Sequence, residues 1–466
     1  MRPNFVFILA DDLGYADLGC YGGRASCSPS LDRLASEGLR FTDGYANSPV
    51  CSPTRFALMT GRFQYRLRGG NDEPIASRHR GNPALGLPPA HPTLPSLLRD
   101  AGYATALVGK WHLGFLPHFG PLKSGYGEFF GPMSGGLDYF THRDSAGHHD
   151  LYEGEAEAHR VGYLTDLISE RAAEFVGRQA ASRTPFLLSV HYTAPHWPWE
   201  TREDDALART LERISHTDGG SVQTYLTMIR HMDEGIGRVL EALTRIGAAE
   251  NTFVVFTSDN GGERYSDTWP LVGKKMDLLE GGIRVPYIVR WPARVPAGRD
   301  TPQLAITMDW VATFLEAAGA APDSGYPLDG ISLLPVLVNP NLRVERDLYW
   351  RMKFRNQRAM HRGTGSISPS TATSFCSIFP GISVNGRTVR GTNRTGWPPC
   401  ERATLRGKRP CPPYRPTQRS RSRTRRPTWP SRPDRVYAKI SVTARETSGN
   451  ASSVTVAAPV RRLVSR

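Results

Sequence analysis

Short apolar runs alternate with amphipathic segments from residue 5 to residue 353 of the 466-residue chain. The apolar runs, each typical of a strand buried on both faces, lie at 5–10, 104–108, 186–191, 252–257 and 286–291, and a further strand opens at 347–353. Segments with helical spacing lie at 31–37, 93–101, 163–179, 223–246 and 308–318. This alternation predicts an α/β fold with a large, mostly parallel central sheet flanked by helices. Ser28 or Ser30 is expected to cap the first helix, and Gly102 to end the second.

Oxygen-bearing side chains follow two of the predicted strands. Asp11 and Asp12 come directly after 5–10, and Asp259 and Asn260 follow 252–257. Each pair alone fits an ordinary turn. In a parallel sheet, however, ligands bind beyond the carboxyl ends of the strands. If the two strands are neighbours, four hard oxygen ligands converge at one edge, as Ca²⁺ or Mg²⁺ requires.

Cys51 and Arg55 stand one helical turn apart, with Pro53 between them. Residues at this spacing share a helix face. A guanidinium beside a nucleophile would stabilise it and could hold an oxyanion. A buried Cys that only packs as a small apolar residue is an equally good interpretation of these residues taken alone.

The stretch from Cys51 to Gly61 resembles the signature of the type I sulfatases, C-x-P-x-R-x4-T-G. These are formylglycine-dependent, arylsulfatase-like enzymes of the alkaline phosphatase superfamily. Five further blocks resemble the same family in the same order: 7–14, 109–114, 194–198, 258–263 and 280–286. The resemblance spans roughly residues 3–360. It implies the sulfatase fold, with a central sheet and a small C-terminal antiparallel subdomain.

The resemblance also implies a nucleophile and a metal site. Cys51 would be oxidised to formylglycine by a formylglycine-generating enzyme, and its hydrated aldehyde would attack the sulfate ester. Arg55 would steady that diol. A divalent cation, usually Ca²⁺ in this family and alternatively Mg²⁺, would be held by Asp11, Asp12, Cys51, Asp259 and Asn260.

Two lysines and two histidines carry the family's remaining roles. Lys110 and Lys275 would hold the sulfate oxygens. His196 would protonate the leaving oxygen, and His112 would accept the proton that the second diol hydroxyl releases. Lys275, rather than Lys274, has the family's spacing of five residues before Glu280, although Met276 stands where the family usually has glycine.

Two other polar residues near these motifs receive no catalytic role. His191 closes the apolar run 186–191 and fits a packed core histidine. Asp309, in the segment 308–318, is explained by helix capping or packing.

The resemblance predicts hydrolysis of aryl or carbohydrate sulfate esters. A phosphonate monoester or phosphodiester hydrolase shares the same Cys-x-Pro-x-Arg chemistry and is the alternative enzyme. Specificity lies in loops, and the segments 62–89 and 141–152 are expected to line the mouth of the site. His142, His148 and His149 in the second loop fit solvated histidines better than a transition-metal site.

The charge of the chain is divided unevenly. Residues 362–466 hold 21 Lys and Arg against three acids, so this tail carries +18 and the remainder −4. The tail is rich in Arg, Pro and Ser and lacks amphipathic periodicity, which predicts disorder. We therefore divide the chain into a catalytic domain (1–345), the start of a C-terminal subdomain (346–360) and a tail (361–466). The tail is interpreted as a frameshift product, which leaves the usual antiparallel subdomain missing or scrambled.

A genuine basic tail is the alternative, in which the Arg-rich run 419–426 binds anionic polymers. Under the frameshift interpretation nucleic acid is not an expected partner, and the substrate is a small-molecule or glycan sulfate ester.

The sequence contains no run approaching a membrane span, so no membrane association is expected. The N-terminal run 5–10 is too short for a secretory signal. As written, the protein is expected to be cytoplasmic, whereas a lost upstream signal would make it periplasmic or secreted. Cys20, Cys27 and Cys51 do not demand an oxidising compartment.

Overall fold

The computed structural model describes residues 2–182, 184–210 and 219–363 and the short segments 375–377, 383–384, 387–388, 441–445 and 451–454. It divides into two compact units, one of residues 1–379 with 440–466 and one of 380–439. In the second unit the described residues form a hairpin of β16 (Ser383–Val384) and β17 (Arg387–Thr388).

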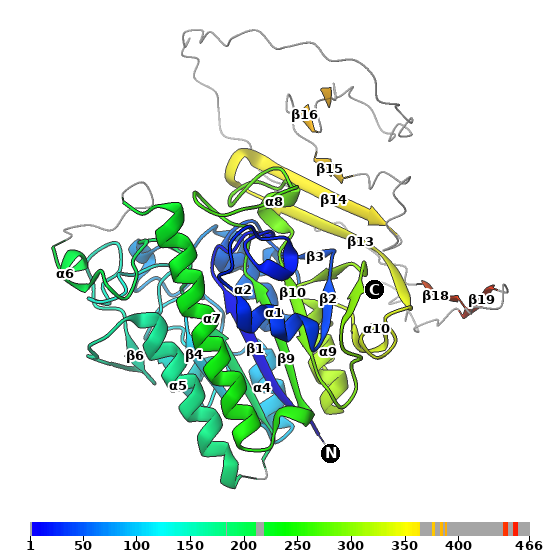
Figure 1. Cartoon of the computed structure of the whole chain (residues 1–466), viewed down its shortest axis with the longest axis horizontal. Coiled ribbons are helices and arrows are strands. Elements are labelled where there is room, and N and C mark those ends of the chain that lie inside the picture. The colour runs from blue at the N-terminus through cyan, green and yellow to red at the C-terminus, as the bar shows by residue number, and fades with distance from the viewer. Residues whose placement is uncertain are drawn as a thin grey trace, which may run out of the picture. The chain divides into compact units, whose positions relative to one another are not determined.

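A ten-stranded sheet forms the centre of the first unit, and five adjacent strands in its middle run parallel (Figure 1). In spatial order the strands are β11 (Arg299–Thr301), β2 (Leu39–Phe41), β10 (Tyr287–Arg290), β9 (Thr252–Ser258), β1 (Asn4–Ala10), β8 (Phe186–His191), β4 (Ala104–Gly109), β5 (Glu128–Gly131), β6 (Tyr152–Glu153) and β7 (Ala156–Glu157). The predicted mostly parallel α/β sheet is confirmed. The run 286–291 forms β10, which is antiparallel to both of its neighbours.

Helices cover both faces of this sheet, because alternate residues of the buried strands point in opposite directions. Val6 and Ile8 of β1 join an apolar cluster with α1 (Pro29–Ser36), α5 (Leu164–Arg178) and α7 (Val222–Arg245), and α5 and α7 run side by side (Figure 1). Phe5 and Phe7 join a second cluster with α2 (Cys51–Thr60), α4 (Leu94–Asp100) and α9 (Asp309–Ala318). The shorter elements are α3 (Arg68–Asn71), α6 (Asp205–Ala208), α8 (Glu280–Ile283), α10 (Leu334–Val338) and the strand pair β3 (Gly44–Tyr45) and β12 (Ala305–Ile306).

The start of α1 differs from the expected capping. Ser28 occupies the N-cap position, but its side chain makes no capping hydrogen bond and instead accepts one from Gly19 N at 2.9 Å. The free N–H groups of Ser30 and Leu31 donate to the carboxylate of Asp233 on α7, each at 2.8 Å. A partner more than 200 residues away therefore satisfies the helix N-terminus.

A hairpin of β13 (Arg343–Met352) and β14 (Gln357–Gly363) follows the central domain. Its sheet has the order β15-β14-β13-β18-β19, with β15 (Phe375–Ser377), β18 (Ser441–Arg445) and β19 (Ala451–Val454). The predicted boundary between residues 360 and 361 lies within β14. The frameshift hypothesis concerns residues that lie mostly outside those described, so it stays a prediction. In the described part of the chain, no helix is both long and apolar enough to cross a membrane.

Candidate active site

Three carboxylates meet at the carboxyl ends of β1 and β9. The two strands pair in parallel with Ala10 opposite Ser258, so Asp11 and Asp259 leave the sheet side by side. Asp259 N donates to Ala10 O at 3.1 Å, which continues the ladder by one bond. Carboxylate oxygens of Asp11, Asp12 and Asp259 all lie within 4.8 Å of one another, as the sequence predicted for neighbouring strands.

The donor set of this carboxylate cluster fits a hard divalent cation. Asn260 joins the cluster through its Nδ2, which donates to Asp12 Oδ1 at 2.7 Å. Asp11 Oδ1 and Asn260 Oδ1 are buried and have no hydrogen-bond partner. Buried oxygens almost always have a partner, and an all-oxygen set is the coordination that Ca²⁺ and Mg²⁺ prefer. These four residues would therefore hold such an ion.

Burial and neighbouring charges shift the pKa values of Asp259 and Asp12 in opposite directions. Burial raises the pKa of Asp259 to about 6, reinforced by the negative charge of Asp11 and opposed by Arg55. Burial also acts to raise the pKa of Asp12, but Lys275 and His196 outweigh it and lower that pKa to about 2. A bound cation would favour the ionised form of Asp259, because a nearby positive charge lowers a carboxyl pKa.

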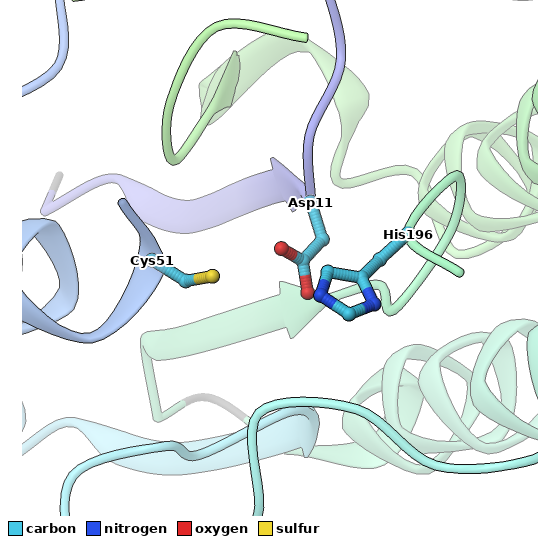
Figure 2. Close-up of side chains that lie close together, drawn as sticks. All are labelled: Asp11, Cys51 and His196. Atoms are coloured by element: carbon cyan, nitrogen blue, oxygen red, sulfur yellow. The ribbon is translucent and has the colours of Figure 1, made fainter. Parts of the chain in front are cut away.

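Cys51 is the first residue of α2, a helix whose ten residues are all buried. Figure 2 shows its sulfur directed toward Asp11 and His196, and one ligand atom of each of the three residues lies within 4.8 Å of the others. Burial raises the pKa of the Cys51 thiol far above its ordinary value, although Lys110 opposes the shift. The thiol is therefore protonated at neutral pH and is a poor nucleophile in this form.

Arg55 lies one turn along α2, as predicted, and its guanidinium is engaged with the carboxylate cluster. Nε and Nη2 both donate to Asp259 Oδ2, at 3.0 and 2.8 Å, and Nη2 lies 3.8 Å from Asp11 Oδ2. Nη1 donates to Lys110 O at 3.0 Å. Arg55 thus fixes the cluster beside Cys51. His191, which received no role, is buried beneath this arginine with Nδ1 3.4 Å from Nη1.

Two lysines contact different carboxylates of the cluster. Lys110 follows β4, and its Nζ donates to Asp11 Oδ2 and to Gly135 O. Lys275 Nζ donates to Asp12 Oδ2 at 2.6 Å and lies 3.7 Å from Glu263 Oε2. Lys274 is exposed, so Lys275 is the member of the pair that the structure brings into the site. The sequence did not single out Glu263.

Both predicted histidines are buried at the site and are held by backbone carbonyls. His112 Nε2 lies 2.7 Å from Ile75 O, while its Nδ1 has no partner. His196 Nδ1 lies 2.6 Å from Trp197 O, and its Nε2 faces Asp12 Oδ2 at 3.7 Å. Burial lowers the pKa of each ring, and the positive charges of Lys110 and Lys275 lower the pKa of His112 and His196, respectively, further.

Glycines allow these rings their positions. A Cβ at Gly135 would lie 2.4 Å from the His112 ring, and one at Gly136 would lie 2.8 Å from the His196 ring. The sequence analysis did not single out either glycine. Of the loops expected at the mouth, 62–89 contributes Ile75, the partner of His112.

The histidine-rich loop differs from the expectation. His142 is buried rather than solvated, and His149 stacks on His159 with ring centroids 4.4 Å apart. His142, His148 and His149 do not form a metal-binding group in the part of the chain that the structure describes.

An anionic ester fits this arrangement best, because two cationic side chains and a cluster of carboxylates that could hold a cation lie around one buried sulfur. Fold and site together define an α/β enzyme that hydrolyses esters of a tetrahedral oxyanion. Comparisons with known proteins give the family. The family model Sulfatase matches residues 3–320, and the chain belongs to the sulfatase family. It is a sulfuric ester hydrolase.

Relatives and solved structures agree with this assignment. The chain is 35% identical over 378 residues to N-acetylgalactosamine-6-sulfatase of Canis lupus familiaris, covering 75% of this chain and 68% of the relative. It is also 35% identical over 418 residues to the enzyme of the same name from Homo sapiens, covering 83% and 76%. The crystal structure of Ps i-CgsB in complex with k-i-k-neocarrahexaose matches with a TM-score of 0.68 and 31% identity, over 77% of this chain and 82% of the other.

Proposed function

We propose that this protein hydrolyses carbohydrate sulfate esters through formylglycine at position 51, with a divalent cation, Ca²⁺ or alternatively Mg²⁺, at the cluster of Asp11, Asp12, Asp259 and Asn260. The observation that carries the proposal is the position of Cys51. Its sulfur lies close to the carboxylate of Asp11 and the ring of His196. Burial raises the pKa of the thiol despite the positive charges of Lys110 and Lys275, so the unmodified side chain stays protonated. A formylglycine-generating enzyme is therefore a required partner for maturation.

Each residue of the site has a separate role in the proposed reaction. One hydroxyl of the hydrated aldehyde gives its proton to the carboxylate of Asp11 beside it and attacks sulfur. The S–O bond to the alcohol breaks as protonated His196, whose charge the facing Asp12 carboxylate stabilises, donates a proton to the leaving oxygen. Lys110 and Lys275 lie where they can hold sulfate oxygens. The cation, when bound, would polarise a sulfate oxygen and lower the pKa of the attacking hydroxyl.

His112 completes the cycle. Its unpartnered Nδ1 can accept the proton of the second hydroxyl as the C–O bond to sulfate breaks, which regenerates the aldehyde and releases sulfate. Water then rehydrates the aldehyde. Arg55 keeps Asp259 in place throughout, because two of its nitrogens donate to one carboxylate oxygen.

Sulfated sugars are favoured over aryl sulfates by the relatives. Five of them carry the name N-acetylgalactosamine-6-sulfatase, and one solved structure holds a neocarrahexaose. N-acetylgalactosamine 6-sulfate is accordingly the first sugar to assay.

The test is a rate comparison on one preparation made together with a formylglycine-generating enzyme. Sulfate release is measured from N-acetylgalactosamine 6-sulfate and other sulfated sugars, and product release from nitrophenyl sulfate and a nitrophenyl phosphonate ester, with Cys51→Ala as the control. We expect the highest kcat/KM on a sulfated sugar and none in the control. A higher kcat/KM on the phosphonate would favour the phosphonate or phosphodiester hydrolase instead.

A further inference from the structure

The loop that carries Lys275 has an unusual backbone. Met276 has a φ of +74°, which is the left-handed conformation. Apart from glycine, Asn and Asp, residues rarely adopt it. A non-glycine residue stays in such a conformation only when its surroundings hold it there. The loop must therefore be fixed by contacts from outside itself.

Gln357, at the start of β14, supplies two of these contacts. Its Nε2 donates to Met276 O at 2.8 Å, and its Oε1 accepts from Leu278 N at 2.8 Å. The side chain is 3% exposed, so these bonds form away from water. One amide thus holds the two backbone positions that enclose the turn after Lys275.

The opposite side of the same turn rests on the segment that precedes the nucleophile. Met276 N donates to Pro49 O at 2.8 Å, two residues before Cys51. Met276 also packs on an apolar cluster that contains Val50 and Cys51 together with Trp350 and Met352 of β13. The turn therefore lies between the start of α2 and the hairpin β13–β14.

We propose that Gln357 is a positioning residue for sulfate binding, which holds the 275–278 turn so that Lys275 Nζ reaches Asp12 and the sulfate beside it. The inference rests on the proposed function, because it assigns Lys275 to the sulfate oxygens. It gives the C-terminal hairpin a part in catalysis, although none of its residues touches the reacting atoms. A binding site whose lysine is misplaced by about 1 Å loses up to about a hundredfold in rate.

The experiment uses the full chain with Ca²⁺ and compares Gln357→Leu, Lys275→Ala and the double variant. Gln357→Leu keeps the side-chain volume and removes both hydrogen bonds to the turn, together with the bond from Nε2 to Phe354 O at 3.1 Å within the hairpin. The readouts are the Kd of inorganic sulfate by calorimetry and kcat/KM on a sulfate ester. We expect Gln357→Leu to weaken both about tenfold, and to add less than about twofold when Lys275 is already alanine. Arg358→Ala, on the exposed side of the same strand, is the matched control and should change neither.

A rescue variant separates positioning from a general loss of stability. Met276→Gly removes the conformational strain, so Gln357→Leu/Met276→Gly should recover most of the sulfate affinity. If Gln357→Leu does not fold, Gln357→Glu replaces it, because it keeps the acceptor for Leu278 N and loses the donor to Met276 O. If Gln357→Leu lowered sulfate affinity and kcat/KM by the same factor whether residue 275 is lysine or alanine, the inference would be overturned. Unchanged sulfate affinity in Lys275→Ala would overturn the proposed role of the lysine and the inference with it, whereas loss in Lys275→Ala but not in Gln357→Leu would overturn the inference alone.

Discussion

Asp259 connects the carboxylate cluster to Arg55, so its removal has two consequences. Asp259→Ala should abolish Ca²⁺ binding, because the remaining oxygens cannot fill the six or more positions that the ion takes. It should also lower the free energy of unfolding by about 3–5 kcal/mol, since the buried guanidinium loses its nearest carboxylate and keeps only the more distant Asp11. Calorimetric Ca²⁺ titration and denaturant unfolding measure the two effects.

The matched control is Asp300→Ala, which removes the exposed ion pair with Arg40. A surface pair contributes about 0–1 kcal/mol to the free energy of unfolding, so the stability should change little. Asp300 lies on β11 and is not part of the carboxylate cluster, so Ca²⁺ affinity and turnover should stay unchanged. Tight Ca²⁺ binding that survives Asp259→Ala would contradict the shared site.

Glu200 gives the protein a dependence of stability on pH. Burial, reinforced by the negative charge of Asp138, raises the pKa of Glu200 from 4.5 to about 8. Between these values the folded state binds more protons than the unfolded state, so the free energy of unfolding falls as pH rises, by at most about 1.4 kcal/mol per pH unit. Glu200→Gln should flatten this slope between about pH 5 and pH 8 in denaturant unfolding, whereas Glu250→Gln, at an exposed position, should leave it as it is. An unchanged slope in Glu200→Gln would show that Glu200 is ionised in the folded protein.

The residues nearest the chemistry could be predicted because they follow strands or share a helix turn. Asp11 and Asp259 converge since their strands pair in parallel, and Cys51 and Arg55 lie on one buried helix. Gln357 could not be predicted in the same way. It contacts a turn about 80 residues away through a fold that no local pattern records.

A buried ion pair is one of the contacts that join the hairpin β13–β14 to the central domain. Arg346 Nη1 donates to Asp309 Oδ2 at 2.6 Å, and the same carboxylate accepts from Ile306 N and Ile331 N. Arg346→Ala should therefore lower the free energy of unfolding by about 3 kcal/mol, because an unpaired charge stays buried. The double variant Arg346→Ala/Asp309→Asn should lose less free energy of unfolding than the two single variants lose in sum.

Denaturant unfolding of both single variants and the double variant measures this coupling. Arg351→Ala serves as the control, since this arginine is exposed on the same strand. Additive losses would contradict a direct pair between Arg346 and Asp309.

Buried apolar runs, including the one that forms the four-residue β10, and amphipathic helices were predictable, whereas short strands without such a run were not. The run 186–191 coincides with β8, and the segment 223–246 lies within one residue of α7. Strands of two to four residues, such as β2 and β5 to β7, are too short for a period to register. The antiparallel direction of β10 depends on chain connections that its apolar composition does not encode. Asp309, expected to cap or pack α9, is buried at the first position of that helix but makes no capping hydrogen bond; its carboxylate accepts from Ile306 N and binds Arg346.

The composition of the chain changes after Met360, and this change makes a prediction about its coding DNA. Residues 362–466 hold three acids among 105 residues, although acids are common before them. Translation of the coding DNA in one of the other two frames should give an aromatic and acid-containing continuation after Met360. Repair of the frame should raise soluble yield and turnover. If neither frame gives such a continuation, the basic tail is genuine, and salt-dependent binding to an anionic polymer becomes the property to measure.

The central claim is that the enzyme hydrolyses sulfate esters through a modified Cys51. Preparations made with and without a formylglycine-generating enzyme should differ in the mass of the peptide that carries Cys51, and its reaction with an aldehyde probe should differ in parallel. The account predicts that the turnover of sulfate ester rises in proportion to the modified fraction and is absent in a folded Cys51→Ala variant. A fully active preparation in which mass spectrometry finds only the unmodified Cys51 thiol would contradict it.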